Sequence, residues 1–169
     1  MPRTFEELAA EEMDALYQGA LFLCGGNPRA AEIVLVDTLT LAFRDHEREP
    51  DAPPIQHWLE GRMVRAFVRR TASGPPPLPP SGPRNRPSGR VGRIGTETLF
   101  KAAAAVPPWP RAAIWLVLLR RWGYQEAAAV LGVARDVLRD LLRYRDHMMS
   151  IVLRSSGRRN GTHGDAVPT

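Results

Sequence analysis

The sequence predicts an all-α protein in which two small helical domains are joined by a linker rich in Pro, Gly and Arg. On both sides of residues 71–98, apolar residues recur at intervals of three and four, the spacing of amphipathic helices. Residues 71–98 have almost no apolar content and cannot support a packed core. A chain of 169 residues with 44% hydrophobic residues can bury one core or two small ones. We therefore expect domains at residues 1–70 and 99–154 and a disordered tail at residues 155–169.

The N-terminal domain is expected to contain three or four helices. The first predicted helix spans about residues 4–24 and ends at Gly25 and Gly26, because glycine favours the left-handed conformation that closes helices. Asn27 is a typical N-cap and Pro28 a typical first-turn residue, so a second helix should cover residues 28–45. This helix is apolar around most of its circumference. Its narrow exposed stripe includes Asp37 and Thr40, with Ile33 and Val36 within or beside it as a candidate sticky surface.

The third predicted helix, at residues 55–70, combines an apolar side with a row of arginines. Its solvent-facing residues are expected to be Arg62, Arg65, Arg69 and Arg70. A basic helix with an aromatic residue near its start suits single-stranded or melted DNA, which makes Trp58 a candidate stacking residue. The alternative is that Trp58 belongs to the core.

The linker at residues 71–98 is expected to be extended, with polyproline character, and at about 3.1 Å per residue it could reach roughly 85 Å. Its arginines could contact nucleic acid or simply be solvated; they are Arg84, Arg86, Arg90 and Arg93. The C-terminal domain should contain four helices. The first begins near Leu99 and ends before Val106, and the second opens at Pro110.

Residues 122–146 are typical of a helix-turn-helix, with two short helices around a turn at Gly132. The second of them carries Arg135, Arg139 and Arg143 four residues apart, opposite apolar residues that would face the core. Such a helix can pack and still offer guanidinium groups to DNA. The alternative is that Arg139 and Arg143 pair with acidic residues three positions earlier on a solvated face.

Charge is divided sharply along the chain. Residues 1–60 hold 12 acidic and 4 basic side chains, whereas the rest of the chain has a net charge of +13. We expect the two parts to face different partners.

Several function classes are disfavoured by the same sequence. The single cysteine, Cys24, excludes an internal disulfide and a cysteine-based zinc site, and the four histidines lack the spacing of metal ligands. No Gly-rich phosphate-binding motif is present, so we expect no enzyme, metal or cofactor. The longest apolar run, residues 112–119, is too short to span a bilayer, and the acidic N-terminus is unlike a signal peptide. The expected location is the cytoplasm.

Three segments in order resemble one protein family. Residues 31–43, AEIVLVDTLTLAF, align without gaps to the pattern Ala-Glu-Asp-Leu-Val-Gln-Glu-Thr-Phe-x-x-Ala-Trp of extracytoplasmic-function (ECF) sigma factors of bacterial RNA polymerase. Residues 106–114, VPPWPRAAI, are similar to the family's Leu-Pro…Arg…Val-Leu segment. Residues 126–133, EAAAVLGV, are similar to its Glu-Ile-Ala-x-x-Leu-Gly-Val turn. The resemblance covers most of residues 10–150, and the chain is identified as a divergent member.

The resemblance implies a transcription initiation factor that binds core RNA polymerase and promoter DNA, with an anti-sigma factor as a further partner. The second helix would dock on polymerase through Glu32, Ile33, Val36, Asp37 and Thr40. The third would help to open the −10 element through Trp58, Arg62, Arg65, Arg69 and Arg70. The helix-turn-helix would read the −35 element through Gln125, Arg135, Arg139 and Arg143. The two elements lie roughly 60 Å apart if some 17 base pairs of 3.4 Å separate them, within the linker's reach.

Two alternatives stay open. At Ile33 and Val36 the family has polar residues, so the chain could be a sigma-like module that has lost initiation and binds a regulatory protein through this apolar pair. It could also be a helix-turn-helix repressor whose N-terminal part dimerises or senses a ligand.

Overall fold

The computed structural model describes residues 4–46, 54–71, 74 and 95–157, and these are almost entirely helical, with no strand among them. The N-terminal segment forms α1 (Phe5–Glu11), α2 (Met13–Leu23), α3 (Pro28–His46) and α4 (Ile55–Arg70). The C-terminal segment forms α5 (Thr96–Ala104), α6 (Pro108–Ile114), a π-helix η1 (Trp115–Leu119), α7 (Tyr124–Leu131), α8 (Arg135–Leu142) and α9 (Tyr144–Gly157). The predicted all-α class is confirmed. The linker arginines at positions 84, 86, 90 and 93 lie outside the described residues.

The prediction of one helix over residues 4–24 is wrong, because the helix breaks at Glu12 into α1 and α2. Thr4 begins α1 with a capping box, in which its side chain accepts from the Glu7 N–H and Glu7 accepts from the Thr4 N–H. The break turns α1 so that the buried ring of Phe5 reaches Trp58 on α4, with ring centroids 6.2 Å apart. Tertiary packing therefore overrides the continuous helical periodicity.

The helix end predicted at Gly25 and Gly26 and the helix start predicted at Asn27 are both present between α2 and α3. Gly25 and Gly26 both have positive φ, at 62° and 82°, and the side-chain oxygen of Asn27 accepts from the Ala30 N–H at 3.2 Å. Gly25 has a second role, because a Cβ there would lie 2.9 Å from the backbone of Ala104 on α5. The turn thus brings the two segments of the chain into close contact.

The C-terminal segment departs from its predicted bounds in four places. Helix α5 begins at Thr96, so residues 96–98 of the predicted linker are helical and precede the expected start near Leu99. The helix expected to open at Pro110 already begins at Pro108, a favourable first-turn position for proline. It runs into η1, where the Arg120 N–H donates to the Trp115 carbonyl at 3.0 Å, and Arg121 then adopts a positive φ of 58°. The last helix is divided at Arg143 into α8 and α9, and α9 continues to Gly157, so residues 155–157 are helical rather than a disordered tail.

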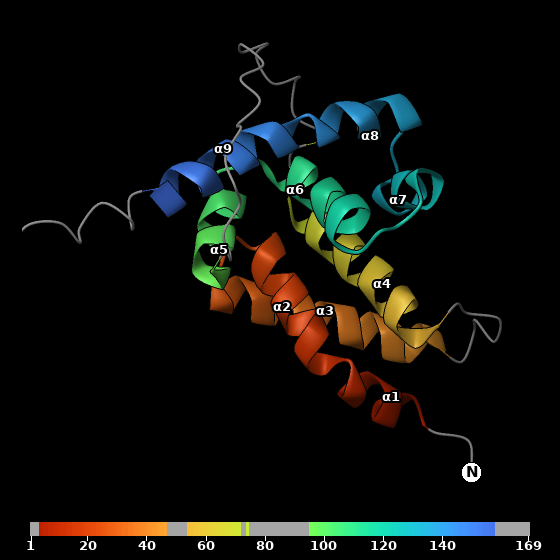
Figure 1. Ribbon diagram of the computed structural model, residues 1–169. Coiled ribbons are helices and arrows are strands. Elements are labelled where there is room, and N and C mark those ends of the chain that lie inside the picture. Colours follow the sequence, from red (N-terminus) through yellow and green to blue (C-terminus); the bar gives the residue numbers. More distant parts are fainter. Residues whose placement is uncertain (1–3, 47–53, 72–73, 75–94, 158–169) are drawn as a thin grey trace, which may run out of the picture.

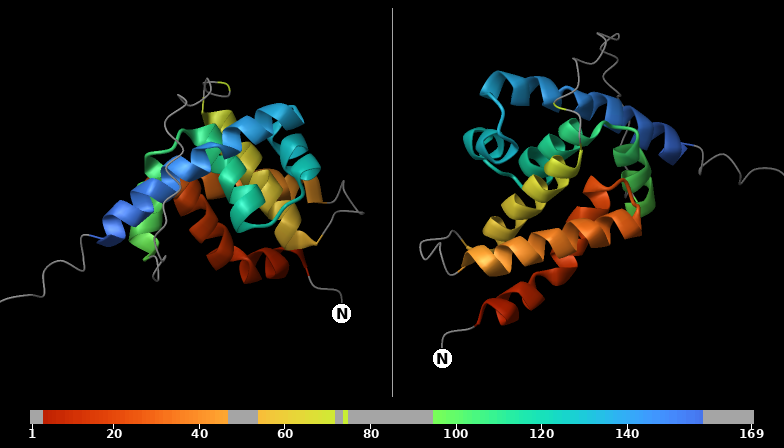
Figure 2. Two further views of the ribbon diagram at one scale, coloured as in Figure 1. Left: turned by 45° about the horizontal axis from the view of Figure 1, so that its top comes forward. Right: turned by 180° about the vertical axis from the view of Figure 1, so that it is seen from behind.

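The buried apolar residues form one cluster that runs from Phe5 in α1 to Val152 in α9. In Figure 1, α1, α2 and α3 occupy the lower part of the molecule, α8 and α9 cross the top, and α4 rises between them. Figure 2 shows the same arrangement from above and from behind. Helix α2 contacts α5, α6 and η1, and α4 contacts α6 and α7. The sequence predicts two separate cores, whereas the described residues share one.

Candidate functional site

Helices α7 and α8 are joined by a tight turn with helix-turn-helix geometry. Gly132 closes α7 with a φ of 67°, and the Val133 N–H donates to the Ala128 carbonyl at 3.0 Å. Leu131, Leu138 and Leu141 are buried, which fixes the inner faces of both helices against α6. The opposite face of α8 is therefore directed to solvent.

The predicted −35-type residues lie on this solvent face or beside it. Gln125 is exposed in the first turn of α7, and Arg135, Arg139 and Arg143 are exposed along α8 and at its end. Arg139 lies 3.4 Å from Asp136 and Arg143 lies 3.6 Å from Asp140, as the alternative interpretation expects. Because both arginines are more than 60% exposed, these ion pairs are weak, and a phosphate could replace the carboxylate. Arg135 forms no ion pair among the described residues.

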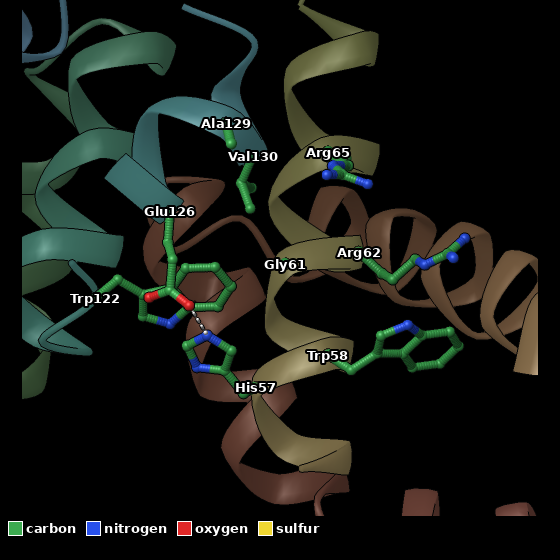
Figure 3. Close-up of a pocket in the computed structure, with 9 residues that line it drawn as sticks. All are labelled: His57, Trp58, Gly61, Arg62, Arg65, Trp122, Glu126, Ala129 and Val130. Carbon is green, nitrogen blue, oxygen red and sulfur yellow. Dashed lines mark ion pairs between the residues drawn. The ribbon is translucent and has the colours of Figure 1, made fainter. Parts of the chain in front are cut away.

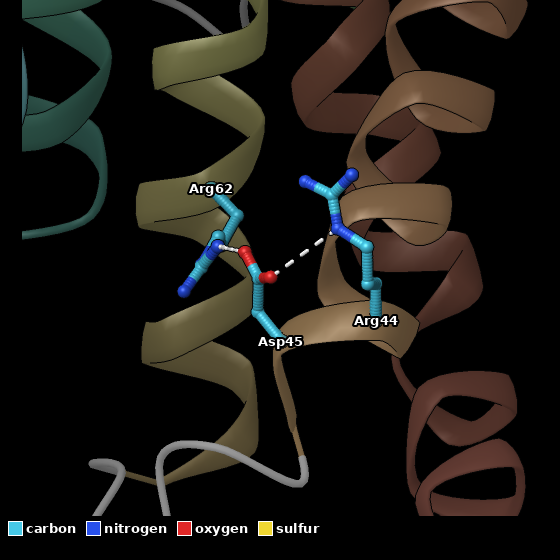
Figure 4. Close-up of polar contacts among 3 residues, drawn as sticks. All are labelled: Arg44, Asp45 and Arg62. Carbon is cyan, nitrogen blue, oxygen red and sulfur yellow. Dashed lines mark hydrogen bonds and ion pairs between the residues drawn. The ribbon is translucent and has the colours of Figure 1, made fainter.

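The predicted −10-type residues on α4 divide into two groups. Trp58 is only 6% exposed, and its ring makes edge contacts with Phe5 and His46. Arg62 stacks on the Trp58 ring at 4.7 Å and forms an ion pair with Asp45, which also approaches Arg44 at 3.5 Å (Figure 4). The hydrogen bond from Arg62 lowers the pKa of the Asp45 carboxyl. The structure thus places Trp58 in the core, the alternative weighed from the sequence, and gives Arg62 a packing role.

The remaining −10-type arginines lie on the surface of α4. Arg65, Arg69 and Arg70 are all exposed. Arg70 donates to Asp37 on α3 at 2.6 Å, so it engages a residue predicted to bind polymerase. Neither Arg65 nor Arg69 forms an ion pair within the described part of the chain. Of the arginines on α4, these two are therefore the most available to bind an anion from another molecule.

An apolar stripe runs along the outer face of α3. Ile33, Val36 and Phe43 are 47%, 63% and 60% exposed. Glu32 and Thr40 are exposed beside them, although the Thr40 hydroxyl donates to the Val36 carbonyl at 2.7 Å. Phe43 was not among the residues predicted for this surface, although it follows Val36 by seven residues, two turns along the same face.

Two buried charged residues hold the N-terminal and C-terminal segments together, and neither was recognised from the sequence. Glu60 on α4 is 5% exposed and accepts from Arg120 Nε at 2.7 Å and from Trp122 Nε1 at 3.2 Å. Arg111 on α6 donates to the carbonyls of Leu23 at 2.6 Å and Val106 at 2.7 Å. Burial lowers the pKa of Arg111. Their contacts between the segments could not be predicted from local sequence, because Leu23 is 88 residues from Arg111 and the donors to Glu60 are 60 and 62 residues from it.

A pocket of about 270 Å³ opens between α4 and α7, beside Glu60, and we call it the seam pocket. On one side the His57 ring stacks on Trp122 with centroids 3.7 Å apart, and His57 Nε2 lies 3.4 Å from a Glu126 carboxylate oxygen. Figure 3 shows these three side chains on one side of Gly61 and Trp58, Arg62 and Arg65 on the other. The pocket therefore has an aromatic wall and a basic wall.

No known protein family, curated protein or solved structure matches this chain. Within the described ranges, no three His, Cys, Asp or Glu side chains are grouped closely enough to hold a metal ion. In the same ranges, no helix has both the length and the apolar character needed to cross a bilayer.

Proposed function

We propose that this protein is a DNA-binding transcription factor of the sigma type, which contacts duplex DNA through α8 and core RNA polymerase through the outer face of α3. The observation that carries the proposal is the helix-turn-helix at α7 and α8. Its buried leucines fix α8 in place, while Arg135, Arg139 and Arg143 stay exposed on the other face. Arginine contacts phosphate as a cation and the guanine edge by paired hydrogen bonds, so this face suits the major groove.

The apolar stripe of α3 supports the second part of the proposal. Ile33, Val36 and Phe43 expose large apolar side chains in one row, and such rows on soluble proteins mark surfaces that bind other proteins. Glu32 adds a negative charge to the edge of this row. An apolar contact with an acidic border is the chemistry we propose for the polymerase contact.

The proposal requires the two segments to separate during promoter binding. Helices α6 and α7 each contact both α4 and α8, so at about 8 to 10 Å per packed helix pair α4 and α8 are at most about 20 Å apart. Promoter elements some 17 base pairs apart are separated by roughly 60 Å of duplex. The packed form therefore binds one element at a time, and residues 71–98 would let the segments span both.

The DNA contact is tested by replacing Arg139 and Arg143 together with Ala. We expect the affinity for duplex DNA to fall at least tenfold and the dependence of affinity on salt to become shallower, because two phosphate or base contacts are lost. The matched control replaces Arg29 and Arg44, two exposed arginines of α3, and so removes the same charge. Equal loss in both variants, or none in the first, would show that α8 is not the DNA contact.

The polymerase contact is tested by changing Ile33 to Asp and Val36 to Gln in the full chain. We expect weaker capture of purified core RNA polymerase and fewer promoter-dependent run-off transcripts, since the apolar row is interrupted. The exposed apolar row equally favours a regulatory protein as its partner. A well-folded chain that neither binds core polymerase nor supports transcription would select that second candidate.

A further inference from the structure

Gly61 lies at the centre of the seam pocket lining. A Cβ at this position would lie 3.0 Å from Trp122 and 3.6 Å from Val130, so any side chain there would enter the space between α4 and α7. Glycine in the middle of a helix is unfavourable by roughly 1 kcal/mol relative to alanine. At this position it leaves a concave surface at the contact between the two segments, which is a common place for small-molecule sites.

The aromatic wall of the pocket offers flat rings rather than flexible chains. His57 and Trp122 stack with an angle of 14° between their planes, and Trp122 is fixed by its hydrogen bond to Glu60. A fixed aromatic wall favours a planar ligand, because ring contacts depend on a defined geometry. Ala129 and Val130 of α7 also line the pocket and contribute apolar surface.

The opposite wall carries positive charge. Arg62 and Arg65 both line the pocket, and Arg62 already shares its charge with Asp45. Arg65 is exposed and forms no ion pair with any residue that the structure describes. The one carboxylate of the lining, Glu126, lies against His57 on the aromatic side. An anionic group would therefore be placed beside Arg65, where a guanidinium offers charge-assisted hydrogen bonds.

The volume limits the size of the ligand. A cavity of roughly 150 Å³ lined by apolar side chains holds benzene. The seam pocket, at about 270 Å³, has room for two fused rings with a small substituent. It is too small for most drug-sized ligands, whose pockets begin at about 300 Å³.

We propose that the seam pocket binds a small planar aromatic acid with one ring or two fused rings, which lie against the stacked His57 and Trp122, and with its carboxylate beside Arg65. Because the walls come from both α4 and α7, such a ligand would bind only when the two segments are packed together. It would therefore stabilise the packed form. This inference rests on the pocket alone and does not depend on the DNA or polymerase contacts.

The test is a calorimetric titration of the full chain with 2-naphthoate as the probe, which measures the affinity and the number of binding sites. We expect saturable binding to one site and a rise in the midpoint of thermal unfolding. Cyclohexanecarboxylate, which has the charge without the aromatic rings, and 2-naphthol, which has the rings without the carboxylate, should each bind at least tenfold more weakly. Binding of all three with similar affinity would overturn the proposal, and so would an absence of 2-naphthoate binding at millimolar concentration.

The Arg65→Gln variant tests whether the carboxylate of the ligand lies beside Arg65. This residue is exposed, so the substitution should leave the fold intact, and we expect it to weaken 2-naphthoate binding about tenfold. Arg69→Gln is the matched control, because Arg69 is exposed one turn later on α4 and does not line the pocket. Equal affinity in the Arg65 and Arg69 variants would overturn the assignment of the carboxylate to Arg65. Gly61→Leu, which fills the pocket, should abolish binding, and circular dichroism checks its fold.

Discussion

Glu60 joins the two segments through side-chain hydrogen bonds. Its carboxylate is buried on α4, and both of its hydrogen-bond donors, Arg120 and Trp122, come from the C-terminal segment. A buried charge without partners is costly, so the carboxylate is tolerated in the packed form because Arg120 and Trp122 donate to it. The same carboxylate fixes the Trp122 ring that forms the aromatic wall of the seam pocket.

Replacing Glu60 with Ala should lower the free energy of unfolding by about 2 to 3 kcal/mol. The change leaves the Trp122 N–H without its acceptor in a buried position, and Arg120 loses its ion pair while keeping some access to water. Urea unfolding monitored by circular dichroism measures the loss. Glu97→Ala is the control, because the exposed pair between Glu97 and Lys101 should contribute less than about 1 kcal/mol. Similar losses in the two variants would contradict the role given to Glu60.

Cys24 should make stability depend on alkaline pH. Burial raises the pKa of its thiol from 9.0 to about 11, and nearby Arg111 only partly opposes this. Between pH 9 and about 11 the unfolded thiol has lost its proton while the folded thiol keeps it, so ionisation stabilises the unfolded chain. The stability that the protonated thiol provides is complete below pH 9 and is lost as pH rises to about 11.

This effect is measured as the difference in unfolding free energy between the wild-type chain and Cys24→Ala, from pH 8 to pH 11. We expect the advantage of the wild type to shrink across this range. All other ionisable groups are common to both chains, so their contributions cancel in the difference. A difference that stays constant with pH would show that the thiol ionises equally in both states.

At the scale of elements, the sequence predicted the helices whose ends are marked by local chemistry. Helix α4 begins and ends at the predicted residues, and α3 begins at Pro28 behind the predicted cap at Asn27 and extends one residue further, to His46. The break at Glu12 was not predictable, because it serves a contact between Phe5 and Trp58 that is distant in sequence. The same holds for η1, whose π-type turn directs Trp122 toward Glu60.

In the candidate site too, features set by local sequence were predicted and features set by distant residues were not. The arginine row of α8 follows from helical periodicity, which needs only neighbouring residues. Trp58 and Arg62 share that periodicity, but their environment is set by Asp45, Phe5 and His46 from other helices. Periodicity predicts which face of a helix a residue occupies, and it does not indicate what covers that face.

Arg121, two residues after the end of η1, is the one non-glycine residue with positive φ in the described ranges, at 58°. This conformation costs a residue with a Cβ roughly 1 to 2 kcal/mol, and glycine adopts it freely. Because Arg121 is exposed, Arg121→Gly should raise the unfolding free energy by up to about 1 kcal/mol, after the larger entropy of the unfolded glycine chain is subtracted.

Thermal and urea unfolding of Arg121→Gly provide the measurement. Arg121→Ala is the control, since it removes the same side-chain charge and keeps the Cβ, and it should leave stability nearly unchanged. If both variants gain stability equally, charge and not backbone strain is the cause.

At the scale of the whole molecule, the distribution of prolines suggested two independent domains, because residues 71–98 cannot form a core. The composition of a linker does not determine whether the surfaces of the segments at its ends are complementary. The described residues on both sides contribute to one apolar cluster, and Glu60 and Arg111 cross between them. A linker permits two bodies to separate, but the complementarity of their surfaces decides whether they do.

The chain should therefore unfold in a single cooperative transition. The apolar surfaces of α2 and α4 would be exposed if α5, α6 and α7 separated from them, so partial unfolding of either segment also destabilises the other. In calorimetry we expect one peak whose measured enthalpy equals the van't Hoff enthalpy. Glu60→Ala, which weakens the contact between segments, should broaden this peak or divide it, whereas Glu97→Ala should leave it single. Two peaks in the wild-type chain would mean that the segments fold as separate domains, and the seam pocket would then form only transiently.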